Sequence, residues 1–192
     1  MTNLLDTYLL FRIRARRDPD AYAELYDRYV TSIYRFALLK LPTKEQAEDI
    51  TSETFLRTWQ FLQETKEPVK NIRALLYRIA RNLIVDLYRK DHGRTVPLPS
   101  VTFLEDETST LHVRDLTDGS KGQALIEAQA DIALVLDKIA RLKTDYQDVL
   151  TLRLIDGLGY DDIGTILEKP AGNVRVIYHR AMKALEALLA KD

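Results

Sequence analysis

Apolar residues recur every three or four positions along most of this chain, and that spacing constrains the fold more than any other feature. The pattern is clear in residues 20–40, where it is carried by Leu25, Tyr29, Ile33, Phe36 and Leu39. Residues spaced in this way share one face of an α-helix and can be buried together. No segment has the sequence pattern of a β-hairpin, so the chain predicts an all-α fold.

Breaks and capping residues indicate where the helices begin and end. Pro42 interrupts the first pattern, and Thr43 with Gln46 has the spacing of a capping box that opens a helix reaching about residue 63. A third helix is predicted over residues 71–90, with a stripe made of Ile72, Leu76, Ile79, Leu83 and Leu87. Further helices are predicted over residues 123–142, 145–156, 160–168 and 173–190.

A polar segment rich in Ser and Thr separates these two groups of helices. It carries prolines and glycines but no sustained helical stripe, which is the composition of a flexible linker. We therefore expect two small helical domains, over residues 1–92 and 129–192, joined by a linker over residues 93–128.

The composition argues against an enzyme. The chain has no cysteine, and its three histidines, His92, His112 and His179, are spaced neither as metal ligands nor as a catalytic triad. It also lacks a glycine-rich phosphate loop. We expect no catalytic residue, no metal site and no cofactor.

The sequence also indicates where the protein works. Its first residues place a short apolar run before the arginines, the reverse of a secretion signal, and no run approaches the roughly 20 apolar residues of a membrane span. We expect a cytoplasmic protein that does not insert into a membrane.

Residues 160–181 have the pattern of a helix-turn-helix. Gly164 leaves room for two helices to approach closely, while Pro170 and Gly172 would break the chain at the turn. Inward positions of the motif are predicted to be Ile163, Ile166, Leu167, Val174, Ile177, Ala181 and Leu185. The second helix would then present Arg175, Val176, His179 and Arg180 to DNA. An ordinary helical hairpin with solvated arginines remains the alternative.

The predicted helix over residues 71–90 is basic and carries tyrosines. Arg78, Asn82 and Arg89 share the face opposite its apolar stripe, and Tyr77 and Tyr88 are interleaved with the basic residues. Basic groups follow a phosphate backbone and aromatic rings stack on unpaired bases, although many basic faces are simply solvated. The preceding helix mixes acidic and aromatic residues. Acidic residues are common in the first turn of a helix, and aromatic residues are common in a core. A mixed surface of this kind is also typical of a site that binds a protein partner.

Taken together, four segments in this order resemble the extracytoplasmic-function class of bacterial sigma factors, in the sigma-70 family. They are AEDITSETFLRTW, LLYRIARNLIVDLYRK, LRLIDGLGYDDIGTIL and GNVRVIYHRAMKAL. The resemblance covers about residues 8–92 and 130–190 and leaves the linker unmatched.

The resemblance implies a transcription initiation factor that binds RNA polymerase core and directs it to promoters. Its first domain would bind the clamp coiled coil of the largest subunit in or beside Asp49, Glu53, Phe55 and Trp59. It would read and help to melt the −10 element through Asn71, Arg73, Tyr77, Arg78, Asn82 and Arg89. The second domain would rest on the polymerase flap and read the −35 element through Arg175, Val176, His179 and Arg180. An anti-sigma factor is a further partner that the resemblance suggests.

The chain departs from the family pattern at a few positions. Leu75 and Leu76 precede Tyr77 where a Trp-Leu pair is common, and Asn173 replaces the threonine that usually opens the recognition helix. Val176 stands where a small polar residue is common, and it could contact a thymine methyl group. The −35 preference is therefore an open question.

Two alternatives from other classes remain. A self-sufficient helix-turn-helix repressor or activator would bind a near-palindromic site as a dimer, and would leave the basic helix without a role. A helical scaffold that binds only proteins would tolerate charge reversal at Arg175 and Arg180.

Overall fold

The computed structural model describes residues 4–65, 67–91 and 134–190, and these ranges contain helices and no strand. The all-α prediction is therefore confirmed. The N-terminal domain consists of α1 (Leu4–Arg16), α2 (Pro19–Leu38), α3 (Lys44–Glu64) and α4 (Ile72–Asp91). The C-terminal domain begins with helical residues 134–140 and continues with α7 (Thr144–Leu150), the π-helical turn η1 (Thr151–Ile155), α8 (Tyr160–Leu167) and α9 (Ala171–Leu189). The linker predicted over residues 93–128 lies outside the described residues.

Side-chain caps set the starts of the N-terminal helices. Asp18 accepts hydrogen bonds from the backbone of Asp20 and Ala21 at the start of α2. Thr43 accepts one from Gln46, as the sequence predicts. Asn71 accepts one from Ala74 at 2.9 Å, so its side chain satisfies an otherwise free amide of α4. Helix α1 was not foreseen as a separate element.

Helices α2 and α4 bury the apolar faces that their periodicity predicts, and α3 packs against both. The fully buried side chains of this core include Leu25, Ile33, Phe36, Leu62, Ile72, Leu76 and Ile84. Helix α3 also buries Thr51, Thr54 and Thr58, whose hydroxyls donate to the carbonyls four residues before them. These back-bonds satisfy the hydroxyls, so the small side chains can lie inside the core.

The helix-turn-helix is confirmed in α8 and α9, but its turn differs from the predicted one. Glu168 adopts a left-handed conformation, with φ of 55°, and ends α8. Helix α9 then begins at Ala171 after Pro170, which makes no side-chain cap. Gly172 and Asn173 therefore lie inside the first turn of α9, and this helix begins two residues before the predicted start at residue 173. Pro170 has no polar side-chain atom, so it leaves the first amides of α9 without a side-chain cap.

Gly164 has the role that the sequence predicts. A Cβ atom placed there would lie 2.6 Å from the carbonyl oxygen of Lys169. A side chain at this position would therefore push α8 away from the turn that leads into α9.

The π-helical turn η1 continues α7 and redirects the chain toward α8. The Asp156 amide donates to the Thr151 carbonyl at 3.1 Å, a bond that spans five residues instead of four. The Arg153 guanidinium donates to the Leu158 carbonyl at 2.8 Å and so links η1 to the loop that leads to α8. The sequence predicted a single helix over residues 145–156, so this change of helical type is a correction.

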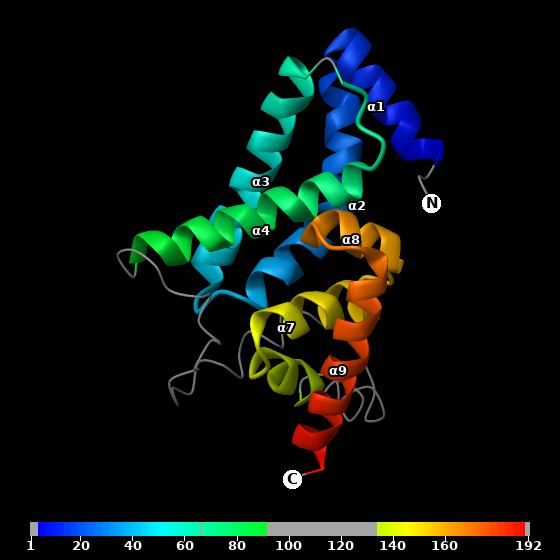
Figure 1. Ribbon diagram of the computed structural model, residues 1–192. Coiled ribbons are helices and arrows are strands. Elements are labelled where there is room, and N and C mark those ends of the chain that lie inside the picture. Colours follow the sequence, from blue (N-terminus) through cyan, green and yellow to red (C-terminus); the bar gives the residue numbers. More distant parts are fainter. Residues whose placement is uncertain (1–3, 66, 92–133, 191–192) are drawn as a thin grey trace, which may run out of the picture.

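The two domains pack against each other. Helix α8 lies beside α4 (Figure 1), and one apolar core runs through both domains. Leu76 and Ala80 of α4 belong to it together with Val149, Leu152 and Ile163 of the C-terminal domain. A second small core holds α7 against α9, through Ile139, Leu142, Leu150, Ala181 and Leu185.

We also compared the helices with the dimensions of a membrane. Within the described ranges, none is both long and apolar enough to cross one.

Candidate nucleic-acid and protein interfaces

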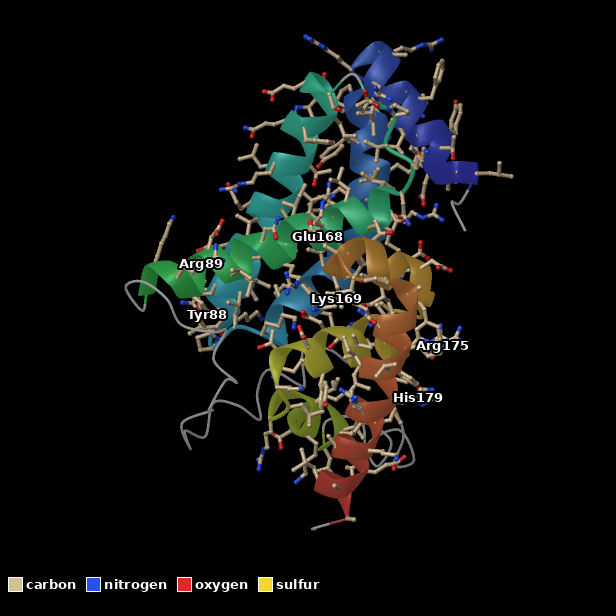
Figure 2. All side chains as sticks on the ribbon, viewed as in Figure 1. Tyr88, Arg89, Glu168, Lys169, Arg175 and His179 are labelled. Carbon is tan, nitrogen blue, oxygen red and sulfur yellow. The ribbon has the colours of Figure 1, made fainter. Side chains whose placement is uncertain are left out.

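The outer face of α9 is defined here as Arg175, Val176, His179 and Arg180. All four side chains are exposed, as the sequence predicts. The inward positions of the same helix are buried, with Val174 and Ala181 at 0% exposure and Leu185 at 4%. Figure 2 shows Arg175 and His179 pointing away from the body of the molecule. This face is therefore accessible to solvent.

Aromatic contacts hold Arg175 in place. Its guanidinium lies 5.3 Å from the ring centroid of Tyr160, and that of Arg153 lies 4.8 Å from the same centroid. Tyr178 packs its ring edge-on against Tyr160, with centroids 5.9 Å apart. Such stacking orders a long side chain before any ligand arrives, which reduces the entropy cost of binding.

The predicted −10 residues fall into two groups on α4. Arg78 is half-buried, while Asn82 and Arg89 are exposed toward the C-terminal end of the helix. Arg89 lies near Asp86 at 3.8 Å, and Figure 2 places it at the end of α4 far from α9. These three side chains form one open polar face, as the periodicity predicts.

Asn71, Arg73 and Tyr77 are instead covered by the C-terminal domain. The Asn71 amide donates to Asp162 of α8 at 2.7 Å, and the Arg73 guanidinium donates to the Asp156 carbonyl. Tyr77 is fully buried, and its ring packs edge-on against Phe36 with centroids 5.3 Å apart. In this structure Asn71 and Arg73 bind residues of the C-terminal domain, and Tyr77 is buried in the core.

Burial changes the acid–base properties of this contact. Desolvation raises the pKa of Asp156 above its ordinary value, although Tyr77, Arg35 and Arg73 act in the opposite direction. Desolvation likewise raises the pKa of the Tyr77 hydroxyl, and the neighbouring Asp156 carboxylate adds to that rise. The two groups therefore favour the neutral state while the domains are packed together.

The predicted polymerase-binding residues of α3 are not equally accessible. Asp49 is exposed, and Glu53 pairs with Arg57 one turn later at 2.6 Å. Phe55 is only 3% exposed and packs against Tyr26, while the half-buried Trp59 packs edge-on against Tyr22. Phe55 therefore lies in the core beneath this surface.

The sequence did not single out the cluster at the centre of the contact between the domains. Asp148 of α7 is 1% exposed, and its two carboxylate oxygens lie 2.5 Å from Lys40 Nζ and 3.1 Å from Arg81 Nε. A charged residue inside the apolar segment YQDVLTL was the available signal. Its cationic partners could not be inferred, because they lie in the other domain.

Two family models match the chain, in order. The model for sigma-70 region 2 matches residues 25–95, and the model for sigma-70 region 4 matches residues 132–185. The first match includes α3, α4 and most of α2. The second includes α7, α8 and most of α9.

Curated relatives match over most of the chain. The ECF RNA polymerase sigma factor BldN of Streptomyces coelicolor is 30% identical over 175 residues, which are 91% of this chain and 62% of BldN. The ECF RNA polymerase sigma factor SigW of Bacillus subtilis is 30% identical over 172 residues, which are 90% of each chain.

A solved structure shares the fold. CnrH, in its complex with the cytosolic domain of CnrY, superposes with a TM-score of 0.65 at 22% identity. The superposition covers 98% of this chain and 99% of that one.

Proposed function

Since this chain belongs to the extracytoplasmic-function class of the sigma-70 family, we propose that it is a transcription initiation factor that recruits RNA polymerase core to promoters. The observation that carries this proposal is the ordered pair of matches to sigma-70 regions 2 and 4. Each match falls on one of the two helical domains. Catalysis would belong to the polymerase, so the chain itself would need no catalytic group. Because the polymerase works in the cytoplasm, the chain would work there as well.

The outer face of α9 is proposed to read the −35 element. Arg175 and Arg180 can form paired hydrogen bonds with guanine or hold phosphates, and His179 extends the same polar row. Val176 is 48% exposed, which suits contact with a thymine methyl group. The open position of this face and the ordered Arg175 side chain support the assignment.

The −10 element is proposed to bind along α4. Arg78, Asn82 and Arg89 would follow the backbone from the open half of the helix. Asn71, Arg73 and Tyr77 would contact the melted strand once the C-terminal domain has moved. Basic and aromatic side chains in one row fit a surface that holds an unpaired strand.

The exposed part of α3 is proposed to bind the clamp coiled coil of the largest polymerase subunit. Asp49 and Glu53 supply charge, and the neighbouring Leu56, at 52% exposure, supplies an apolar contact. Trp59 would contribute its accessible edge, whereas Phe55 would support the surface from below. The C-terminal domain would rest on the polymerase flap.

A protein that holds the factor inactive is also proposed. CnrH was solved with the cytosolic domain of CnrY, and a comparable partner for this chain would be an anti-sigma factor. Affinity purification from unstressed cells should recover it. Repeated recovery of polymerase alone would argue against such a partner.

Run-off transcription tests the central proposal. Purified core polymerase is incubated with a library of upstream fragments from the source genome, with and without the protein. Discrete transcripts that depend on the protein are expected, and their aligned starts should define both promoter elements. If the protein instead shifts DNA without core and does not redirect core, it is a self-sufficient repressor or activator.

The Arg175→Ala, Arg180→Ala double variant tests the −35 assignment. Each lost contact to a base or phosphate costs about 1–3 kcal/mol, so we expect run-off transcription to fall at least about tenfold on promoters with both elements. Lys183→Ala, an exposed cation further along α9, is the matched control and should retain activity. Equal activity of the double variant and the control would refute the assignment.

A further inference from the structure

Helix α1 carries apolar side chains on two opposite faces. Those of the first face are buried against α2 and α3; they are Leu9, Leu10 and Ile13. Those of the second face are exposed and are called the α1 seam here; they are Leu4, Tyr8, Phe11 and Ala15. The exposed fractions of Leu4, Tyr8 and Phe11 are 88%, 56% and 63%. Scattered exposed apolar residues are ordinary, but a continuous row of them is typical of a site that binds a partner.

The α1 seam has the spacing of one side of a coiled coil. Its four residues follow one another at steps of four, three and four positions. Apolar residues at alternating steps of three and four form the narrow row along which two helices pack. A helix that lies on a membrane presents a broader apolar face. The geometry of the seam therefore favours a single helix over a lipid surface as its partner.

Arginines flank the α1 seam near its C-terminal end. Each residue turns the helix by about 100°, so Arg12 and Arg14 lie on opposite sides of the row. Arg12 donates to the Asp18 carboxylate at 2.8 Å, and its guanidinium lies 5.7 Å from the ring centroid of Tyr8. Arg14 donates to the Thr65 carbonyl at 3.3 Å, which leaves its charge uncompensated by that contact. In coiled coils the charges on these two sides select the partner.

Basic charge exceeds acidic charge at this end of α1. Arg16 and Arg17 are exposed there, whereas Asp18 pairs with Arg12. The one acidic residue within α1 is Asp6, which is buried at 5% exposure. A second copy of α1 would therefore bring no accessible acid to these arginines. The complementary partner is a helix that carries acidic residues on both sides of its own apolar row.

We propose that the α1 seam binds an acidic amphipathic helix of another protein. This helix would place apolar residues between the side chains of the seam and carboxylates beside the flanking arginines. None of the seam residues is among those proposed to bind DNA or the clamp, and α1 precedes the match to sigma-70 region 2. Figure 1 shows α1 at the end of the N-terminal domain that lies away from α7 and α9. The site is therefore additional to promoter recognition and does not depend on it.

Two synthetic helical peptides of three heptads test the proposed chemistry on the full chain. Both carry leucine along the apolar row; one carries glutamate on the two flanking sides, and the other carries lysine there. Fluorescence anisotropy measures the affinity of each labelled peptide. The glutamate peptide should bind at least about tenfold more tightly than the lysine peptide at 50 mM salt, and this preference should shrink at 500 mM because salt screens the charges. Equal binding of the two peptides, or no binding, would overturn the proposal.

Tyr8→Ser with Phe11→Ser tests the apolar part of the site. This variant should bind the glutamate peptide at least about tenfold more weakly than the wild type. The matched control is Leu154→Ser with Leu189→Ser, which removes two apolar side chains of the C-terminal domain that are 46% and 37% exposed. The control should bind like the wild type, and circular dichroism checks that both proteins remain helical. Equal affinities of the variant and the control would contradict a specific site on α1.

Arg14→Gln with Arg16→Gln tests the charges while the α1 seam stays intact. The preference for the glutamate peptide over the lysine peptide should fall to about threefold or less. An unchanged preference would show that these arginines do not select the partner, contrary to the proposal.

Two further measurements examine the other possible occupants of the seam. Sedimentation with vesicles of phosphatidylglycerol and phosphatidylcholine tests a lipid surface, and analytical ultracentrifugation tests a second copy of the chain. We expect a monomer that does not sediment with the vesicles. Vesicle binding or dimerisation that is lost in the Tyr8→Ser, Phe11→Ser variant would assign the seam to that occupant and overturn the proposal.

Discussion

At the scale of single residues, burial shifts the pKa of Asp156. Asp156 sits between Tyr77, Arg73 and Arg35, and its pKa is raised because desolvation outweighs these three neighbours. Separation of the domains would return the carboxylate to water and its pKa toward the ordinary value of 3.8. Protonation therefore favours the closed form. This contribution is fully present below the ordinary pKa and is lost as pH rises through the raised pKa.

Asp156→Asn tests this linkage, because the amide imitates the protonated acid. The closed form is the arrangement in which the two domains are packed together. Energy transfer between dyes on the exposed positions Ala23→Cys of α2 and Ala187→Cys of α9 follows its population, since the chain has no other cysteine. We expect the closed fraction of the wild type to fall as pH rises from 4 to 7. The variant should show a smaller change over that range and should be more closed than the wild type at pH 7. A pH profile that is identical in the two proteins would exclude Asp156 as the responding group.

At the scale of helices, periodicity and caps predicted much of the structure and failed at particular places. The stripes of α2 and α4 and the cap at Thr43 were correct, since these depend on neighbours within one helix. The start of α9 was wrong because Glu168, a residue with no preference for a left-handed conformation, makes the turn that Gly172 was expected to make. Nothing in the local sequence marks η1, because residues 151–155 contain neither glycine nor proline and continue the apolar pattern of the preceding helix.

Two glycines of the helix-turn-helix provide a matched prediction. Gly164→Ala would place its Cβ against the Lys169 carbonyl, so we expect the C-terminal domain to lose about 1–3 kcal/mol of stability. Gly172→Ala meets no atom within 4 Å inside α9, so it should be neutral or stabilising by up to about 1 kcal/mol. Thermal unfolding followed by circular dichroism measures both. Similar losses in the two variants would show that the close approach at Gly164 is unimportant.

At the scale of the whole molecule, the sequence predicted two helical domains but not their contact. A helical stripe shows that a face is buried, yet it does not show which partner buries it. The stripe of α4 was assigned to its own domain, whereas Leu76 and Ala80 also belong to the core shared with the C-terminal domain. The same reason explains why the sequence did not show that Asn71 and Arg73 contact the C-terminal domain.

The net charge of −1 leads to a prediction for the whole chain. A nearly neutral protein gains little from the release of counterions, and half of its −10 surface is covered. We expect the free chain to bind promoter duplex at least about 100-fold more weakly than its complex with core polymerase at 150 mM salt. Anisotropy titrations of one labelled promoter with either form provide the comparison. Tight and sequence-specific binding by the free chain would favour the repressor alternative.

The turn η1 also has a consequence for the evolutionary history of this family of sequences. A helical turn closed by a five-residue bond holds one residue more than an ordinary α-helical turn, as a single-codon insertion in an ancestral helix would produce. Relatives without that insertion should show a one-residue gap between the equivalents of Thr151 and Asp156. Because the wider turn absorbs the extra residue, α7 should present the same face to α4 and α9 in relatives with the gap and in relatives without it.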